Sequence, residues 1–155
     1  MENQTDHPGV VILPPLLMVL ALVVMLALHW LWPLRIGRRL LGVALGIILG
    51  VLGIGSIAWG HTTLVKGGTN VSPLKPVRGI VTDGPYRFTR NPLYVGMMSL
   101  FIGVSLMVGT WWGFIVLVPV FLILHYGVIL CEERYLEQKF GDSYLKYKRM
   151  VRRYL

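Results

Sequence analysis

The stretch NPLYVGMMSLFIGVSLMVGTWWGFIVLVPVFLILHYGVILC (residues 91–131) decides the fold, because it contains no Asp, Glu, Lys or Arg over its whole length. It is about twice as long as the roughly 20 apolar residues that one membrane-spanning helix needs. The turn-forming segment GTWWG (residues 109–113) divides it near the middle. We therefore expect two spanning helices joined by a tight turn.

Two further stretches without these charged residues, 10–33 and 40–65, precede this hairpin, and each is long enough for one span. Of the 155 residues, 55% are hydrophobic and only 14% are charged, which is too apolar for a soluble domain of this size. The sequence thus predicts an all-α, polytopic integral membrane protein with about four spans, at 10–32, 40–61, 92–109 and 112–135.

The whole chain, 1–155, is expected to form one membrane domain. Two N-terminal spans occupy 1–65, and a cofactor-binding core occupies 66–155. The apolar spacing in 134–140 predicts an amphipathic extension of the last span. Gly141 then breaks the helix, and a short helix at the membrane interface should follow from Asp142.

The net charge of +8 is concentrated in two places. Seven basic residues follow Cys131, and five lie in the 62–91 loop. Four spans place both groups on one side, which the positive-inside rule predicts to be cytoplasmic. Arg35, Arg38 and Arg39 fall on the opposite side and conflict with that rule. Attraction to anionic lipid explains the charge with fewer assumptions than nucleic-acid binding.

Some features argue against other classes of protein. The N-terminus carries Glu2 and Asp6 instead of basic residues, which is not typical of a cleavable signal peptide. Cys131 is the single cysteine, so an intramolecular disulfide and a multi-cysteine metal site are excluded, and no metal is expected.

Glycines recur at four-residue spacing in the second span, at Gly42, Gly46 and Gly50. Such a face lets another helix approach closely. The spacing does not distinguish packing within one chain from packing between two copies.

Polar side chains gather at the two ends of the predicted hairpin: Arg90, Asn91 and Tyr94 at its start, Glu132 and Glu133 at its end. The two ends of a tight hairpin lie side by side, so these groups should converge. Free N–H groups at a helix start favour an anion such as a carboxylate, and the acidic pair favours a cation. A zwitterionic amino-acid moiety suits this arrangement, although a structural ion pair without a ligand explains it equally well.

Three motifs in order resemble the isoprenylcysteine carboxyl methyltransferase family, whose wider group includes the phospholipid N-methyltransferases. They are TRNPLYVG (residues 89–96), the acidic pair 132–133, and FGDSYLKY (residues 140–147), and GIVTDGPY (residues 79–86) also looks like the family's approach to the first. The resemblance covers about 66–150. It implies that S-adenosyl-L-methionine is held between the loop and the last two helices.

The resemblance also implies a role for each matching position. Glu132 would take the amino group of the cofactor, and Arg90, Glu133 and Tyr147 would support or orient the catalytic centre. Glu133 is the candidate base for a thiol or amine acceptor. The cofactor-binding residues would be Arg78, Gly79, Ile80, Val81, Tyr86, Asn91, Pro92, Leu93, Tyr94 and Glu132, and the catalytic residues Arg90 and Glu133.

Two positions depart from the family pattern. Asn91 replaces the family histidine, and an amide cannot serve as a titrating base near neutral pH. Val128 stands where the eukaryotic carboxyl methyltransferases carry a substrate-binding arginine. We therefore expect an apolar or lipid-like acceptor, with a carboxylate, thiol or amine as the group that is methylated.

Two other classes remain open from the sequence. Membrane sterol reductases resemble the same core and bind NADPH there, but they are usually much longer. A non-catalytic membrane scaffold is the third class. The small size favours a bacterial or archaeal inner membrane, with the site on the cytoplasmic face.

Overall fold

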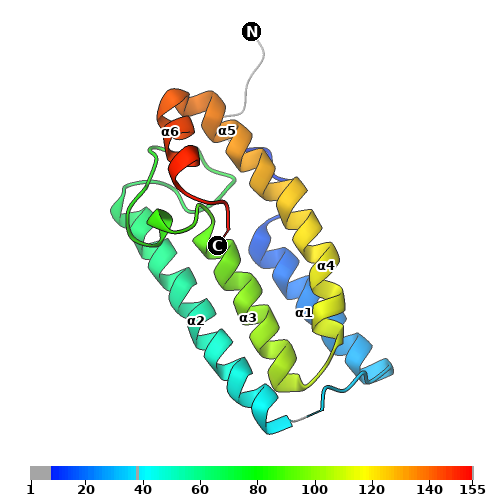
Figure 1. Ribbon diagram of the computed structural model, residues 1–155. Helices are drawn as coiled ribbons and strands as arrows, with labels where there is room; N and C mark the ends of the chain where they lie inside the picture. The colour runs from blue at the N-terminus through cyan, green and yellow to red at the C-terminus, as the bar shows by residue number, and fades with distance from the viewer. Residues whose placement is uncertain (1–7, 38, 155) are drawn as a thin grey trace.

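The computed structural model describes residues 8–37 and 39–154, and every named element in this part of the chain is a helix (Figure 1). The all-helical membrane class expected from the sequence is therefore confirmed. Glu2 and Asp6, which argue against a signal peptide, and Arg38, which conflicts with the positive-inside rule, lie outside the described residues.

Within the described residues, three helices are long and apolar enough to cross a membrane: α1 (Pro14–Leu31), α2 (Arg39–Lys66) and the continuous helix Trp112–Phe140. The apolar helix α3 (Pro92–Val108) has 17 residues, or about 26 Å at 1.5 Å per residue. That is shorter than the roughly 30 Å of a bilayer's hydrocarbon core. The count of four spans therefore remains a prediction.

The helices begin and end close to the predicted positions, with two larger differences. The first helix begins at Pro14 instead of about 10, and α2 continues to Lys66 instead of about 61. It stops at Gly67 and Gly68, whose N–H groups donate to carbonyls of the last turn. Gly68 has a φ of 69°, the left-handed conformation that commonly ends a helix.

The predicted tight turn joins α3 to the last long helix. Gly109, with φ 74°, caps α3 by donating to the carbonyls of Ser105 and Leu106. The Ser105 hydroxyl donates to the Thr110 carbonyl at 2.8 Å and so holds the turn closed. The next helix begins at Trp112.

The last long helix has three parts: α4 (Trp112–Leu124), a π-helical turn (His125–Ile129) and α5 (Leu130–Phe140). Gly127 in the π turn accepts a hydrogen bond of 3.0 Å from the Val11 N–H, so the segment before α1 is attached there. Gly141 then breaks the helix with φ 51°, and α6 (Asp142–Met150) follows. Both the amphipathic extension and the short final helix agree with the sequence expectation.

The glycine face of α2 packs against α3 within the chain. A Cβ on Gly46 would lie 2.6 Å from the Gly103 carbonyl, and one on Gly53 would lie 2.7 Å from the Gly96 carbonyl. Contacts this short are sterically impossible for a side chain, so glycine lets the two backbones meet. The glycine stripe is thus occupied by α3.

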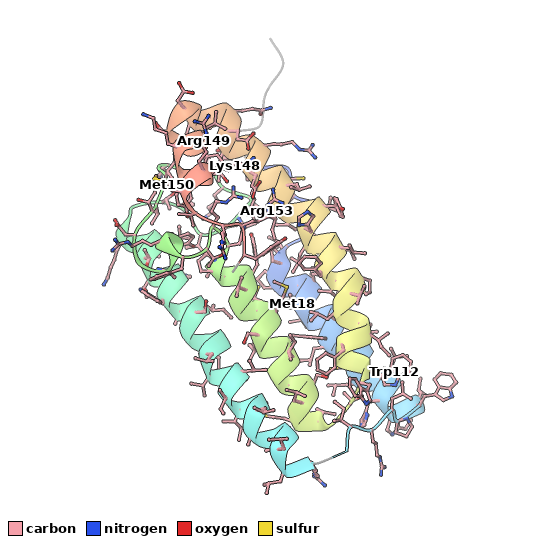
Figure 2. All side chains as sticks on the ribbon, in the orientation of Figure 1. Met18, Trp112, Lys148, Arg149, Met150 and Arg153 are labelled. Atoms are coloured by element: carbon pink, nitrogen blue, oxygen red, sulfur yellow. The ribbon has the colours of Figure 1, made fainter. Side chains whose placement is uncertain are left out.

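Figure 1 shows α2 and α3 side by side, and α1 packs chiefly on α4. The loop after α2, the 3-10 turn Gly84–Arg87, the end of α5 and α6 all lie at one end of the bundle. In Figure 2, Lys148, Arg149 and Arg153 gather at this end, whereas Trp112 lies toward the other. The two basic regions therefore share one side, as the even number of helical passes predicts.

Candidate active site

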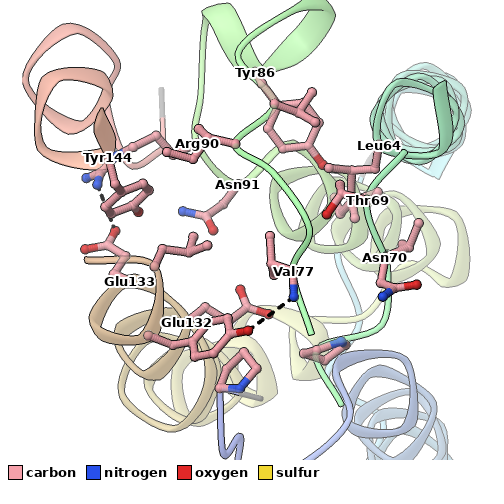
Figure 3. A pocket seen from close by; sticks show the side chains of 18 of the residues that line it. Leu64, Thr69, Asn70, Val77, Tyr86, Arg90, Asn91, Glu132, Glu133 and Tyr144 are labelled. Atoms are coloured by element: carbon pink, nitrogen blue, oxygen red, sulfur yellow. Dashed lines mark hydrogen bonds and ion pairs between the residues drawn. The ribbon is translucent and has the colours of Figure 1, made fainter. Parts of the chain in front are cut away.

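A pocket of about 850 Å³, including its open mouth, lies at the end of the bundle that carries α6. Its walls come from the loop after α2, the start of α3, α5 and α6. Figure 3 looks into it: Glu132 and Glu133 on α5 lie on one side, Asn91 and Arg90 on another, and Thr69, Asn70 and Val77 of the loop close a third. The pocket thus forms where the two ends of the hairpin meet, as the sequence predicts.

Tyr94 and Glu132 connect α3 to α5 across the pocket. The Tyr94 hydroxyl donates a hydrogen bond of 2.7 Å to Oε1 of Glu132. Tyr94 is buried, and both residues line the pocket. The hydrogen bond therefore fixes one carboxylate oxygen of Glu132 at the pocket wall.

Glu133 is surrounded by cations. Arg153 binds it with two parallel bonds, Nε to Oε1 at 2.7 Å and Nη2 to Oε2 at 2.8 Å. Arg90 Nη1 lies 3.2 Å from Oε1, and Lys148 Nζ lies 3.8 Å from Oε2. Since the Glu133 side chain is only 7% exposed, this arrangement is a buried charge network and not a surface ion pair.

Arg90 is the cation of this network that belongs to the pocket lining. Its side chain is 8% exposed. Neither Nε nor Nη1 makes a hydrogen bond to any described residue, although Nη1 pairs electrostatically with Glu133. Both nitrogens are buried, so the ion pair with Glu133 stabilises the charge of the guanidinium.

The C-terminal tail returns to the site after α6. Residue 152 pairs with Thr89 in an isolated parallel bridge, and the Arg152 carbonyl accepts from the Arg90 N–H at 2.9 Å. The Arg153 carbonyl accepts from Thr89 Oγ1 at 3.1 Å and from Asn91 Nδ2 at 3.0 Å. Tyr154, the last described residue, forms a hydrogen bond of 2.6 Å between its hydroxyl and His125 Nδ1. The tail therefore connects the start of α3 to the π turn.

Three tyrosines form the apolar floor near α6. Tyr86, Tyr144 and Tyr147 pack together, and the Tyr147 hydroxyl donates to the Tyr86 carbonyl at 2.8 Å. Burial is the main cause that raises the pKa of Tyr144 to about 12, and it raises the pKa of Tyr86 and of Tyr147 further. All three hydroxyls are therefore neutral donors at physiological pH.

Comparison with known proteins agrees with this geometry. A family model described as "Phospholipid methyltransferase" matches residues 41–143, which is about two thirds of the chain and contains α2, α3, the acidic pair and the start of α6. The chain belongs to the phospholipid methyltransferase family. The resemblance inferred from the three motifs is thereby confirmed.

Two curated relatives extend the family assignment. The chain is 35% identical over 72 residues to a protein-S-isoprenylcysteine O-methyltransferase of Schizosaccharomyces pombe, covering 46% of this chain and 30% of that protein. It is 36% identical over 66 residues to an uncharacterized protein of Haemophilus influenzae, covering 41% of this chain and all of that protein. No solved structure matches. The chain spans less than a third of the length of the S. pombe protein.

In this member of the family, the pocket gathers nearly every residue that the sequence predicted for the site. Arg78 is the exception: it is exposed and outside the pocket lining, and its backbone N–H donates to Thr69 Oγ1 at 3.0 Å. The predicted residues that line the pocket are Gly79, Ile80, Val81, Tyr86, Arg90, Asn91, Pro92, Leu93, Tyr94, Glu132, Glu133 and Tyr147.

The sequence missed two groups of residues. One is the polar wall of the loop, Thr69 and Asn70, which no motif marks. The other is Arg153, which contacts Glu133 from the terminal basic run. One signal in the sequence could have found Arg153. Neighbouring side chains in an extended segment face opposite sides, so only one of Arg152 and Arg153 can point inward.

Proposed function

We propose that this chain is an integral membrane methyltransferase that uses S-adenosyl-L-methionine. It transfers the methyl group to an apolar or lipid-like acceptor at the cytoplasmic membrane face, and the acceptor atom belongs to a carboxylate, a thiol or an amine. Family membership supports the reaction class. The pocket supports the donor.

One observation carries the proposal: the Glu132 carboxylate and the start of α3 lie in the same pocket. Glu132, oriented by Tyr94, suits an ammonium group. The N–H groups of the first turn of α3, which no side chain caps, suit a carboxylate, and Arg90 adds a positive charge to the same pocket lining. An amino-acid moiety carries an ammonium and a carboxylate together, so it matches both groups at once.

The methyl donor, when bound, would supply a sulfonium methyl group to the acceptor: the new bond to the methyl carbon would form in line as its bond to sulfur breaks, and the neutral thioether would be the leaving group. The residues of the chain contribute orientation and exclusion of water. Tyr86 and Tyr147 provide a buried wall, and Glu132 and the start of α3 would hold the two charged ends of the donor. A carboxylate acceptor needs no base, whereas a thiol or amine must lose a proton.

The geometry supports an orienting role for Glu133. Arg153 occupies both of its oxygens, and Arg90 and Lys148 add two further positive charges. Glu132 has one oxygen engaged by Tyr94 and is the carboxylate that is more available to a ligand.

An apolar acceptor fits the surroundings of the pocket. Val128, at the position of the eukaryotic substrate arginine, is fully buried in the core between α1, α3 and α4. Leu64, Leu93 and Leu136 line the pocket. No cation approaches from the position that the eukaryotic enzymes use, so recognition of the acceptor should depend on apolar contact.

Calorimetric titration of detergent-purified protein with S-adenosylhomocysteine tests the donor, with NADPH titrated in parallel. We expect micromolar binding of the thioether, loss of binding in Glu132→Ala, and retention in Glu137→Ala. Glu137 is a matched control because it lies on the same helix, outside the pocket lining. Binding of NADPH instead would assign the chain to the reductase class. If neither compound bound, a non-catalytic membrane scaffold would be favoured.

A further inference from the structure

Arg152 and Arg153 are neighbours in a terminal basic run, yet the structure uses them differently. Arg152 is exposed, whereas Arg153 turns inward and binds both oxygens of Glu133. A bidentate guanidinium–carboxylate pair is stronger and more directional than a single contact. Its formation raises the pKa of Arg153 above the ordinary value, chiefly through the hydrogen bond to Glu133.

The same residue also holds the start of α3 through its backbone. The Arg153 carbonyl accepts hydrogen bonds from Asn91 Nδ2 and Thr89 Oγ1. Asn91 is the residue directly before α3 and lines the pocket. Arg153 itself is absent from the pocket lining, so any effect on a ligand must pass through Glu133 and Asn91.

Glu133 is shared between Arg153 of the tail and Arg90, which precedes α3. Glu133 carries one negative charge, and Arg153 and Arg90 both approach its Oε1, at 2.7 Å and 3.2 Å. Arg153 makes the short bidentate contact, whereas Arg90 Nη1 makes an ion pair without a hydrogen bond. The tail and the start of α3 are therefore joined by a shared carboxylate as well as by the Arg90 N–H bond to the Arg152 carbonyl.

We propose that Arg153 is a positioning residue of the methyl-donor site: it binds Glu133 and the start of α3, and thereby holds Asn91 and the first turn of α3 in place for a carboxylate in the pocket. The inference rests on the proposed function, since the carboxylate is that of the donor's amino-acid moiety. It adds the C-terminal tail to the site, which none of the three motifs includes.

Titration with S-adenosylhomocysteine tests the proposal, with Arg149→Gln as the matched control. Arg149 is exposed on α6 and its replacement makes the same charge change. We expect Arg153→Gln to weaken binding by about tenfold or more, and Arg149→Gln to stay within about twofold. Arg153→Lys should fall between them, because an ammonium cannot make the bidentate contact. Equal affinities of the Arg153→Gln and Arg149→Gln proteins would overturn the proposal.

A double variant separates positioning from a general loss of structure. If Arg153 acts through Glu133, then Glu133→Gln combined with Arg153→Gln should weaken binding no more than Arg153→Gln alone. Losses that add would show two independent effects and contradict the proposal. Unfolding temperatures measured in the same detergent identify any variant that fails to fold.

Hydrogen exchange of the protein without ligand tests the role of Arg153 separately from the proposed methyl donor. Hydrogen exchange in the peptide around 88–95 should be faster in Arg153→Gln than in wild type, because the tail no longer holds the start of α3, and unchanged in Arg149→Gln. Unchanged exchange in Arg153→Gln would refute positioning even if the wild type failed to bind the thioether. Failure of the wild type to bind, with faster exchange in the variant, would refute the proposed donor alone.

Discussion

The hydroxyl of Tyr94 on α3 donates a 2.7 Å hydrogen bond to Oε1 of Glu132 on α5, and this contact joins the first turn of one helix to the acidic pair of the next. Tyr94→Phe removes the donor but keeps the ring. We expect affinity for S-adenosylhomocysteine to fall by about tenfold, since a hydrogen bond to a charged group contributes about 1.5–3 kcal/mol. Calorimetric titration of both proteins with S-adenosylhomocysteine measures this change in affinity.

The control for this change is Tyr126→Phe, which removes a hydroxyl from a side chain that is 63% exposed and outside the pocket. Its affinity should match that of the wild type. If Tyr94→Phe also matched the wild type, the orientation of Glu132 would not depend on Tyr94.

The contact between α2 and α3 predicts a steep penalty for one added methyl group. In Gly46→Ala, the new Cβ would lie 2.6 Å from the Gly103 carbonyl, so the helices must separate. Overpacking of this kind costs about 1–3 kcal/mol. Thermal unfolding in detergent should show a lower midpoint.

Gly55→Ala is the matched control on the same helix, because a Cβ there meets no atom within 4 Å. Alanine is the better helix former by about 0.5–1 kcal/mol, so this protein should be unchanged or slightly more stable. Equal destabilisation by both changes would show that the close approach of the two helices is not what the glycines provide.

Buried tyrosines at α6 predict a loss of stability in alkali. Burial first, then the charge of Glu133, raises the pKa of Tyr144 from 10.0 to about 12, while Arg90 opposes this. The folded state therefore disfavours tyrosinate. The stabilising contribution is fully present below about pH 10 and is lost as the pH rises through about 12, with a magnitude of about 1–2 kcal/mol.

The measurement is the unfolding midpoint between pH 9.5 and 12 for the wild type and Tyr144→Phe. The variant should lose less stability over this interval because it has no hydroxyl to ionise. Parallel curves for the two proteins would mean that other groups cause the alkaline loss.

The burial of Val128 predicts the effect of placing an arginine there, where the resemblance aligns the substrate-binding arginine of the eukaryotic enzymes. The Val128 side chain is fully buried in the apolar core. Val128→Arg buries an unpaired charge, and we expect destabilisation of more than about 4 kcal/mol, seen as loss of folded protein on size-exclusion chromatography. Val128→Ala, which creates a small cavity, should cost only about 1–3 kcal/mol. A well-folded Val128→Arg protein would show that this position can reach the pocket.

The helices and the convergence of the site were predictable from sequence, because both follow from the length of the uncharged stretches. A tight turn at Gly109 obliges the start of α3 and the end of the next helix to meet, so Arg90, Asn91, Tyr94 and the acidic pair come together. Those relations are local in the hairpin and need no knowledge of the remaining chain.

The parts that escaped prediction depend on contacts between distant segments. The path of the loop past Thr69 is held by single hydrogen bonds, such as that from the Arg78 N–H, and no periodicity reports them. The inward turn of Arg153 exists because the tail pairs with Thr89, which is far away in the sequence. Arg78 is the predicted site residue that lies outside the pocket lining, and since the motif implied only backbone contacts there, its role stays a prediction.

The π turn at His125–Ile129 sets the direction in which the acidic pair faces. A π turn accommodates one more residue than a regular helical turn, and each residue of an α-helix rotates the following side chains by about 100°. Glu132 and Glu133 come directly after it, so their facing relative to α4 is offset by that one residue. The side chains of α5 therefore point in directions that the packing of α4 on α1 does not set. A single extra residue lets one continuous helix pack against the core along one face and line the pocket along another.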